Sequence, residues 1–240
     1  MAQRDHARVT ASGPIQRQAV LMLFPGGAGR VGLGDSQLSI AQTNFLVRSR
    51  HHLAAQGFHV VVMDAASDFL SRSEGLGNDR TSPEHMQDIA VTVAYLRGRF
   101  PGLPIWMIGT SRGTISVANA AAVLTGASAP NAIVLASPVT EPAANNPESL
   151  HDVPLTDITV PALIVVHRQD GCVVTPPEGA KAVYQTLRNR QPLTAALGFD
   201  GGYPPLDDPC EALTTHGYFG IETRVVEAIG RFLRSLLPTP

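Results

Sequence analysis

The chain has 240 residues, a length that a single α/β domain commonly reaches. Hydrophobic residues make up 44% of it and charged residues only 16%, a composition that excludes an intrinsically disordered protein. The formal net charge of −2 offers no basic surface for nucleic acid, and no apolar run has the length of a membrane-spanning helix. We therefore expect no nucleic-acid partner and no membrane span.

Short apolar runs alternate along the chain with longer stretches of helical pattern. The predicted strands cover residues 19–24, 58–63, 105–108, 132–135, 162–166 and 194–199. The predicted helices cover residues 43–56, 82–99, 111–124, 176–190 and 221–236. Most of the strand runs are continuously apolar, which is typical of parallel strands covered on both faces. The alternation predicts one α/β domain over residues 1–240, with a doubly wound, mostly parallel sheet and helices on both faces. Residues 1–18 are expected to be extended or to form a strand.

The segment that carries the most functional information is Gly109-Thr-Ser-Arg-Gly113, a G-x-S-x-G pattern centred on Ser111. An apolar strand precedes it and an alanine-rich helix follows it. A nucleophile elbow needs small residues at both glycine positions, because the turn is tight and the serine backbone is strained. The alternative is a glycine-rich turn between a strand and a helix, without chemistry.

With this elbow, the chain resembles the α/β-hydrolase family over roughly residues 19–236. The resemblance is to serine esterases of the dienelactone-hydrolase and carboxylesterase type, which lack a large cap. The family orders its triad as serine, acid and histidine. Asp170 follows the strand at 162–166, where the family's acid usually lies, and His216 lies in the last loop before the final helix. The resemblance therefore implies a catalytic triad of Ser111, Asp170 and His216.

Other residues compete for two of these roles. Asp170-Gly171 is also a strong turn signal, and Glu141 and Asp200 are alternative acids. His151 and His167 are alternative histidines, although neither lies just ahead of the last helix. The sequence contains no H-E-x-x-H or C-x-x-C spacing, so we expect neither a metal site nor a cofactor.

A glycine-rich loop, Pro25-Gly26-Gly27-Ala-Gly29, follows the first predicted strand. Similar hydrolases take one oxyanion-binding amide from this loop and the other from the residue after the nucleophile. Matched to that pattern, the amides are those of Gly27 and Arg112. Gly26 remains possible because Pro25 replaces the family's histidine. Glycine loops also bind phosphate, but no Gly-Lys-Ser/Thr follows this one.

The two cysteines flank the acid and the histidine that the resemblance implies. Cys172 lies two residues after Asp170, and Cys210 lies six residues before His216. If both loops meet at one site, a disulfide can join them. Such a bond favours a periplasmic or secreted protein, whereas two reduced thiols would fit the cytoplasm. The chain as given begins without a recognisable signal peptide.

The expected function is that of a serine hydrolase, carboxylesterase-like, acting on a small-molecule or polymeric ester. A thioesterase, polyesterase, amidase or peptidase would use the same triad, and a non-catalytic binding protein is the alternative from another class. Tyr203, Tyr218 and Phe219 are expected to line the substrate pocket.

The surroundings of that pocket can also be predicted. Residues 67–81 and 201–209 are expected to rim it as loops, and the stretch between the strands at 132–135 and 162–166 is too short for a large cap. The charged head of Arg112 has two interpretations: contact with an acidic substrate, or a salt bridge within the protein.

Overall fold

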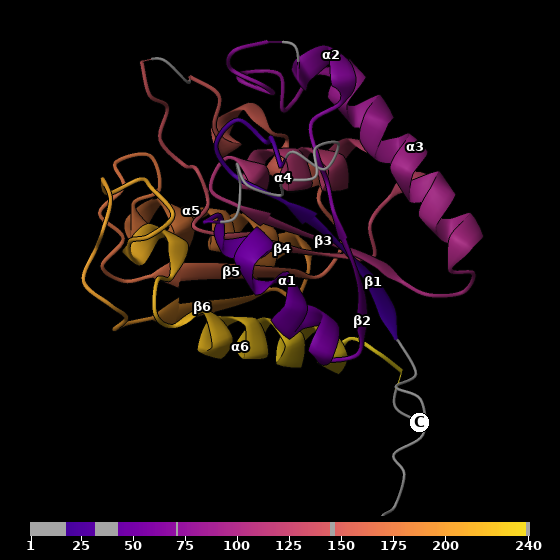
Figure 1. The fold of residues 1–240 in the computed structure, drawn as a ribbon. Helices are drawn as coiled ribbons and strands as arrows, with labels where there is room; N and C mark the ends of the chain where they lie inside the picture. The colour runs from indigo at the N-terminus through magenta and orange to yellow at the C-terminus, as the bar shows by residue number, and fades with distance from the viewer. Residues whose placement is uncertain (1–17, 32–42, 71, 145–146, 239–240) are drawn as a thin grey trace, which may run out of the picture.

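The computed structural model describes residues 18–31, 43–70, 72–144 and 147–238, and its six strands form one sheet (Figure 1). The strands are β1 (Ala19–Phe24), β2 (Phe58–Val62), β3 (Ile105–Thr110), β4 (Ala132–Ala136), β5 (Ala162–His167) and β6 (Ala195–Phe199). Their order is β2-β1-β3-β4-β5-β6, and every neighbouring pair is parallel. The predicted parallel sheet is confirmed. The expectation for residues 1–17 lies outside the described residues.

Helices cover both faces of the sheet, as predicted. The helices are α1 (Phe45–Ala55), α2 (Ser67–Leu70), α3 (Pro83–Arg99), α4 (Gly113–Val123), α5 (Pro177–Arg190) and α6 (Glu222–Ser235). Helices α1 and α6 pack on one face and α3, α4 and α5 on the other (Figure 1). Because side chains alternate along a strand, Met22 of β1 joins the core under α3–α5 while Leu23 joins the core under α1 and α6.

The start of helix α3 was predicted correctly from the sequence, whereas the structure of residues 67–81 was predicted only in part. Helix α3 begins as predicted, with the Ser82 hydroxyl accepting a hydrogen bond from the His85 amide and Pro83 in the first turn. The prediction of a loop over residues 67–81 was wrong in part, because residues 67–70 form the short helix α2. Four residues are too few to show a helical period.

The described part of the crossover from β4 to β5 contains no cap. Its described residues form two 3₁₀ turns, Leu150–Asp152 and Leu155–Asp157, and no α-helix among residues 137–144 and 147–161. The carboxyl ends of the central strands are therefore not covered by an inserted domain on this side.

The strand order places a topological switch between β1 and β3. From β1 the chain crosses to β2 on one side, and then returns to β3 on the other side. In open parallel sheets, ligands bind at the carboxyl ends of strands beside such a switch. The glycine-rich loop follows β1 at this edge, and Ser111 follows β3. None of the described helices is long and apolar enough to cross a membrane.

Candidate active site

Ser111 lies in a strained turn between β3 and α4. Its φ is +52°, a left-handed conformation that residues other than glycine rarely adopt. A Cβ on Gly113 would lie 2.0 Å from the Phe24 carbonyl oxygen, and one on Gly109 would lie 2.4 Å from the Gly113 oxygen. Both glycines of the G-x-S-x-G pattern are therefore required by close backbone packing. This geometry is that of a nucleophile elbow.

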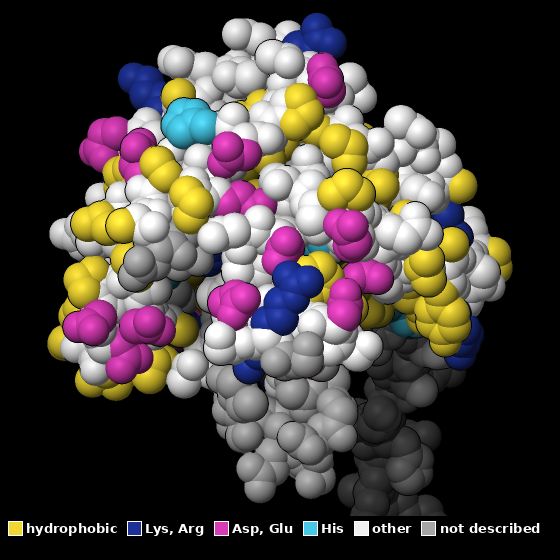
Figure 2. Space-filling view, turned by 90° about the horizontal axis from the view of Figure 1, so that it is seen from above, with side chains coloured by type: hydrophobic (Ala, Val, Ile, Leu, Met, Phe, Trp, Pro, Cys, Tyr) yellow, Lys and Arg dark blue, Asp and Glu magenta, His cyan; other side chains and the backbone are white. Residues whose placement is uncertain are grey.

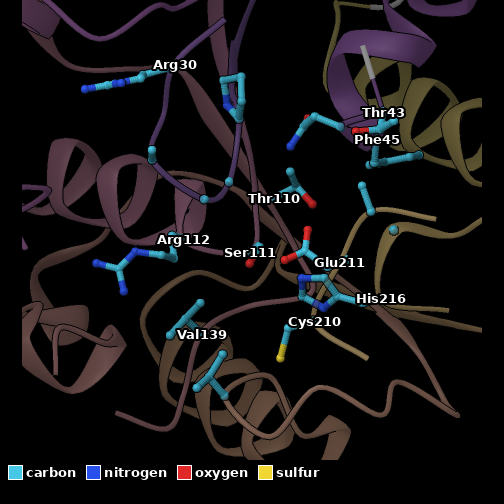
Figure 3. A pocket seen from close by; sticks show the side chains of 18 of the residues that line it. Arg30, Thr43, Phe45, Thr110, Ser111, Arg112, Val139, Cys210, Glu211 and His216 are labelled. Carbon is cyan, nitrogen blue, oxygen red and sulfur yellow. The ribbon is translucent and has the colours of Figure 1, made fainter. Parts of the chain in front are cut away.

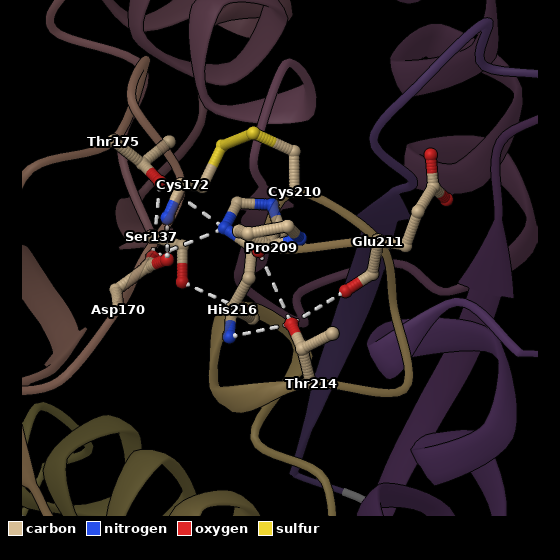
Figure 4. Close-up of a disulfide and its surroundings, with 9 residues drawn as sticks. All are labelled: Ser137, Asp170, Cys172, Thr175, Pro209, Cys210, Glu211, Thr214 and His216. Atoms are coloured by element: carbon tan, nitrogen blue, oxygen red, sulfur yellow. Dashed lines mark hydrogen bonds and ion pairs between the residues drawn. A yellow bond between two sulfur atoms is a disulfide. The ribbon is translucent and has the colours of Figure 1, made fainter. Parts of the chain in front are cut away.

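Asp170 and His216 form a buried hydrogen-bonded pair (Figure 4). Asp170 Oδ2 lies 3.0 Å from His216 Nδ1, and the two side chains are 1% and 5% exposed. The other carboxylate oxygen, Oδ1, accepts the amide of Cys172 at 3.0 Å. The Thr175 hydroxyl donates to Oδ2 at 2.9 Å and lies 3.1 Å from His216 Nδ1. Both oxygens of the carboxylate are thereby held in place, which orients the imidazole.

Ser111 and His216 face one pocket of about 640 Å³ at the carboxyl ends of the strands (Figure 3). His216 uses Nδ1 for Asp170, and its Nε2 has no hydrogen-bond partner among the described residues. Ser111 Oγ and Nε2 are not hydrogen-bonded in this structure. Bonds of this kind commonly tighten only in the complex with substrate, so the arrangement suits a serine nucleophile and a histidine base.

The glycine-rich loop approaches Ser111 closely. A Cβ on Gly26 would lie 2.8 Å from Ser111 Cβ and 3.5 Å from Ser111 Oγ, so a side chain there would displace the serine. Gly26, Gly27 and Arg112 line the same pocket. The amides of Gly27 and Arg112 have no acceptor among the described residues. They are available to bind an oxygen that becomes negative during acyl transfer.

Solved structures of other proteins share the fold of this chain. No family model matches the sequence, and neither does any curated protein. An esterase of Pyrococcus furiosus is similar with a TM-score of 0.63 and 13% identity, over 92% of this chain and 84% of that one. A serine hydrolase without a lid from Xanthomonas campestris is similar with a TM-score of 0.60 and 15% identity, over 95% and 87% of the two chains. The chain has the α/β-hydrolase fold.

A third similar structure points the same way. It is a cold-adapted esterase from an Arctic intertidal metagenomic library, with a TM-score of 0.56 and 12% identity over 90% of this chain and 83% of that one. At these identities the similarity shows the α/β-hydrolase fold, and the function must be argued from the site.

The side chains of the competing acids and histidines make no hydrogen bond or ion pair with Asp170 or His216 in the described part of this α/β-hydrolase fold. Glu141 and His151 are exposed. The carboxylate of Asp200 bonds to Arg168 at the surface. His167 Nε2 lies 2.8 Å from the Gly201 carbonyl oxygen. None of the four forms a hydrogen bond or ion pair with His216 in that part of the chain, whereas Asp170 does, so the geometry favours Asp170 as its partner.

The charged head of Arg112 is held within the protein. Its Nη2 donates to the Gly77 carbonyl, lies 3.4 Å from Asn78 Oδ1 and lies 3.7 Å from the carboxylate of Glu148. The side chain is 10% exposed. Of the two interpretations of this arginine, the structure favours the internal salt bridge.

The aromatic residues expected at the substrate pocket lie elsewhere. Tyr218 is fully buried in the core, where its hydroxyl accepts from the Ser137 amide and donates to the Val165 carbonyl. Burial raises the pKa of this hydroxyl above its usual value. Its left-handed φ of +59° turns the side chain inward. Tyr203 is 63% exposed and packs edge-on against Phe219.

The pocket walls come instead from residues that the sequence analysis did not single out. Their apolar part includes Phe45 at the start of α1 and short aliphatic side chains from the loops after β4 and β5: Val139, Ala143, Val173 and Val174. Of the two predicted rim segments, residues 67–81 contribute Ser73, whereas residues 201–209 are exposed and the wall begins at Cys210.

The predicted disulfide is present and joins Cys172 to Cys210 (Figure 4). It connects the Asp170 loop to the His216 loop, and Cys210 lines the pocket. We expect the double variant Cys172→Ala/Cys210→Ala to lose about 4 kcal/mol of unfolding free energy. The disulfide stabilises the fold because it lowers the conformational entropy of the unfolded chain, and the loop that it closes is long.

Urea denaturation with and without dithiothreitol checks the disulfide prediction. The wild type under reducing conditions should unfold at the same urea concentration as the double variant. A double variant as stable as the oxidised wild type would contradict the prediction.

Thr175 is a functional candidate that sequence reasoning missed. It lies five residues after Asp170, and no short motif marks that spacing. Replacing Thr175 with valine removes the hydroxyl at nearly constant volume. We expect kcat/KM for an ester to fall by about tenfold, since a hydrogen bond to a charged group is worth roughly 1.5 kcal/mol or more. Thr175→Ser should retain most of the activity.

The separation of kcat from KM is the decisive measurement for Thr175. Loss of a hydroxyl that donates to Asp170 and lies beside His216 Nδ1 should lower kcat and leave KM little changed, because it disturbs the base and not the binding of substrate. Thr92→Val is a matched control, because Thr92 donates to a helix carbonyl, that of Asp88, away from the pocket. An unchanged kcat in Thr175→Val would contradict the prediction.

Proposed function

We propose that this protein is a serine hydrolase that cleaves carboxylic esters through an acyl-enzyme on Ser111. The observation that carries the proposal is the buried Asp170–His216 pair facing the same pocket as the elbow serine. A strained nucleophile, an oriented base and free backbone amides converge there, and that combination serves acyl transfer.

In the proposed reaction, His216 Nε2 takes the proton of Ser111 as its oxygen attacks the ester carbonyl. Asp170 holds the imidazole in the correct tautomer and stabilises its protonated form. The amides of Gly27 and Arg112 bind the tetrahedral oxyanion, each contributing about 3 kcal/mol or more to the transition state. The alcohol leaves with the proton from His216, and a water activated by the same residue hydrolyses the acyl-enzyme.

The apolar wall of the pocket favours an uncharged or weakly charged ester, small or polymeric. On the face seen from above, acidic and hydrophobic side chains lie side by side and basic side chains are scattered among them (Figure 2). The pocket's apolar wall can accommodate an acyl chain, and the absence of a cap in the described β4–β5 crossover leaves it accessible. The disulfide fits a periplasmic or secreted enzyme.

Hydrolysis of p-nitrophenyl acetate and butyrate tests the proposal. The same assay is run with the thioester of butyrate and with its p-nitroanilide. Turnover of the oxygen esters at the highest kcat/KM supports the proposal. Exclusive turnover of the thioester or the anilide would assign the same site to another acyl substrate, and the ester proposal would then be wrong.

A further inference from the structure

A buried arginine lies directly behind the glycine-rich loop. Arg80, between α2 and α3, is 1% exposed. Its Nη2 donates to the carbonyl oxygens of Gly27 at 2.8 Å and Pro25 at 3.2 Å, and its Nη1 donates to Ser116 Oγ at 3.0 Å. One guanidinium thus holds two carbonyls of the loop that approaches Ser111.

We propose that Arg80 is a positioning residue that holds the glycine-rich loop in the conformation in which the Gly27 amide can bind the oxyanion. The C=O and N–H of a trans peptide point in opposite directions, so fixing a carbonyl also fixes the amide of the same peptide. Arg80 fixes the peptides on either side of the Gly26–Gly27 peptide. The Gly26 carbonyl itself accepts the Gly29 amide at 3.1 Å. Three successive peptide planes are therefore set, in a loop whose glycines would otherwise leave them free to rotate.

The rest of the cluster keeps Arg80 in place. Ser116 Oγ lies 2.9 Å from His85 Nε2 as well as near the guanidinium. Burial, and secondarily the charge of Arg80, lower the pKa of His85 to about 3, so its ring is neutral and its Nε2 can accept a hydrogen bond from the Ser116 hydroxyl. Glu148 accepts the Arg80 backbone amide at 3.2 Å and the Thr81 amide at 2.7 Å, which fixes the start of the segment leading into α3.

The energetics of Arg80 favour a role in function. Among the described residues, no carboxylate lies within ion-pair distance of its guanidinium, and the nearby Glu148 pairs with Arg112. Burial lowers the pKa of Arg80 to about 9. A buried cation without a direct counter-ion is costly for stability. Here it is solvated by carbonyls of the active-site loop, and its positive charge lies behind that loop.

The test compares Arg80→Met and Arg80→Lys with Arg97→Met. Arg97 is a matched control because it also holds two backbone carbonyls, those of Ala127 and Ala129, in a loop away from the pocket. Active sites in each preparation are titrated with a fluorophosphonate, so that kcat refers to folded, competent protein. A trifluoromethyl ketone serves as an analogue of the tetrahedral intermediate.

For Arg80→Met we expect kcat per titrated site to fall by about 10- to 100-fold, with KM little changed, because a misplaced oxyanion donor affects the transition state more than the bound substrate. The affinity for the ketone should fall by the same factor. Arg80→Lys keeps the charge but not the paired donors, so its kcat should lie between those of Arg80→Met and the wild type. Arg97→Met should keep the wild-type kcat per site.

An unchanged kcat and ketone affinity per titrated site in Arg80→Met would overturn the inference and leave Arg80 a purely structural residue. If Arg80→Met does not fold, Arg80→Lys decides in the same way. The inference rests on the proposed function, and the two can fail separately. A wild type that turns over no ester would contradict both the proposed function and the role of Arg80. An active wild type with unaffected Arg80 variants would contradict only the role of Arg80.

Discussion

Replacing Ser111 with alanine is expected to lower kcat for p-nitrophenyl butyrate by about a millionfold, the effect of removing the nucleophile of a triad. The variant retains the pocket and the oxyanion amides, so it should still bind the ester with a similar affinity. Ser111 Oγ has no hydrogen bond to His216 in this structure, and alanine adds no atoms. We therefore expect little change in unfolding free energy. Steady-state kinetics and thermal denaturation measure the two effects.

Ser128→Ala is the matched control for the serine substitution. Ser128 lies in a 3₁₀ turn, Gly126–Ser128, and does not line the pocket. Its replacement should leave kcat within about twofold of the wild type, as expected of a residue remote from the chemistry. If Ser111→Ala, folded by circular dichroism, hydrolysed the ester as fast as the wild type, Ser111 would not be the nucleophile.

The second large effect is expected from Asp170→Asn, which should lower kcat by about 10⁴-fold. The carboxylate accepts from His216 Nδ1, Thr175 and the Cys172 amide. An amide in its place can present N–H to Nδ1, which favours the tautomer in which Nε2 carries the proton. Such an imidazole cannot act as a base toward Ser111. Pre-steady-state kinetics should show slow acylation with no change in substrate binding.

Asp200→Asn provides the control for the acid. Asp200 also follows a strand and also bonds to a neighbouring side chain, that of Arg168, but at the surface. We expect its kcat to stay within about twofold of the wild type, since exposed ion pairs contribute little. A loss of activity in Asp200→Asn or Glu141→Gln, together with full activity in Asp170→Asn, would transfer the role of the acid to the affected residue.

The sheet was predictable because its signal is local. Short, continuous apolar runs such as residues 19–24 are typical of strands that are buried on both faces. The structure confirms all six predicted strands. The ends of the strands were predicted less accurately. Strand β3 extends to Thr110, past the predicted residue 108, because its pairing with β4 continues through Gly109 and Thr110. A glycine in an apolar run does not show whether the pairing continues beyond it.

Parts of the site depend on distant contacts and could not be predicted. The resemblance implied Asp170 and His216, but Thr175 and Arg80 become visible only when the loops after β5 and α2 reach their partners. Tyr218 shows the reverse problem. It lies two residues from His216 in sequence, and its left-handed backbone nevertheless places its ring in the core. Proximity in sequence to a functional residue does not determine which way a side chain points.

The most direct test of Ser111 as the nucleophile is the site at which a fluorophosphonate modifies the wild-type protein. The proposed mechanism predicts one label per chain, located by peptide mass spectrometry on Ser111. Ester hydrolysis should be lost in proportion to labelling, and Ser111→Ala should take no label. Label on any other residue in parallel with the loss of activity would contradict the mechanism. So would an ester-hydrolysing protein whose Ser111 remains unmodified after complete inactivation.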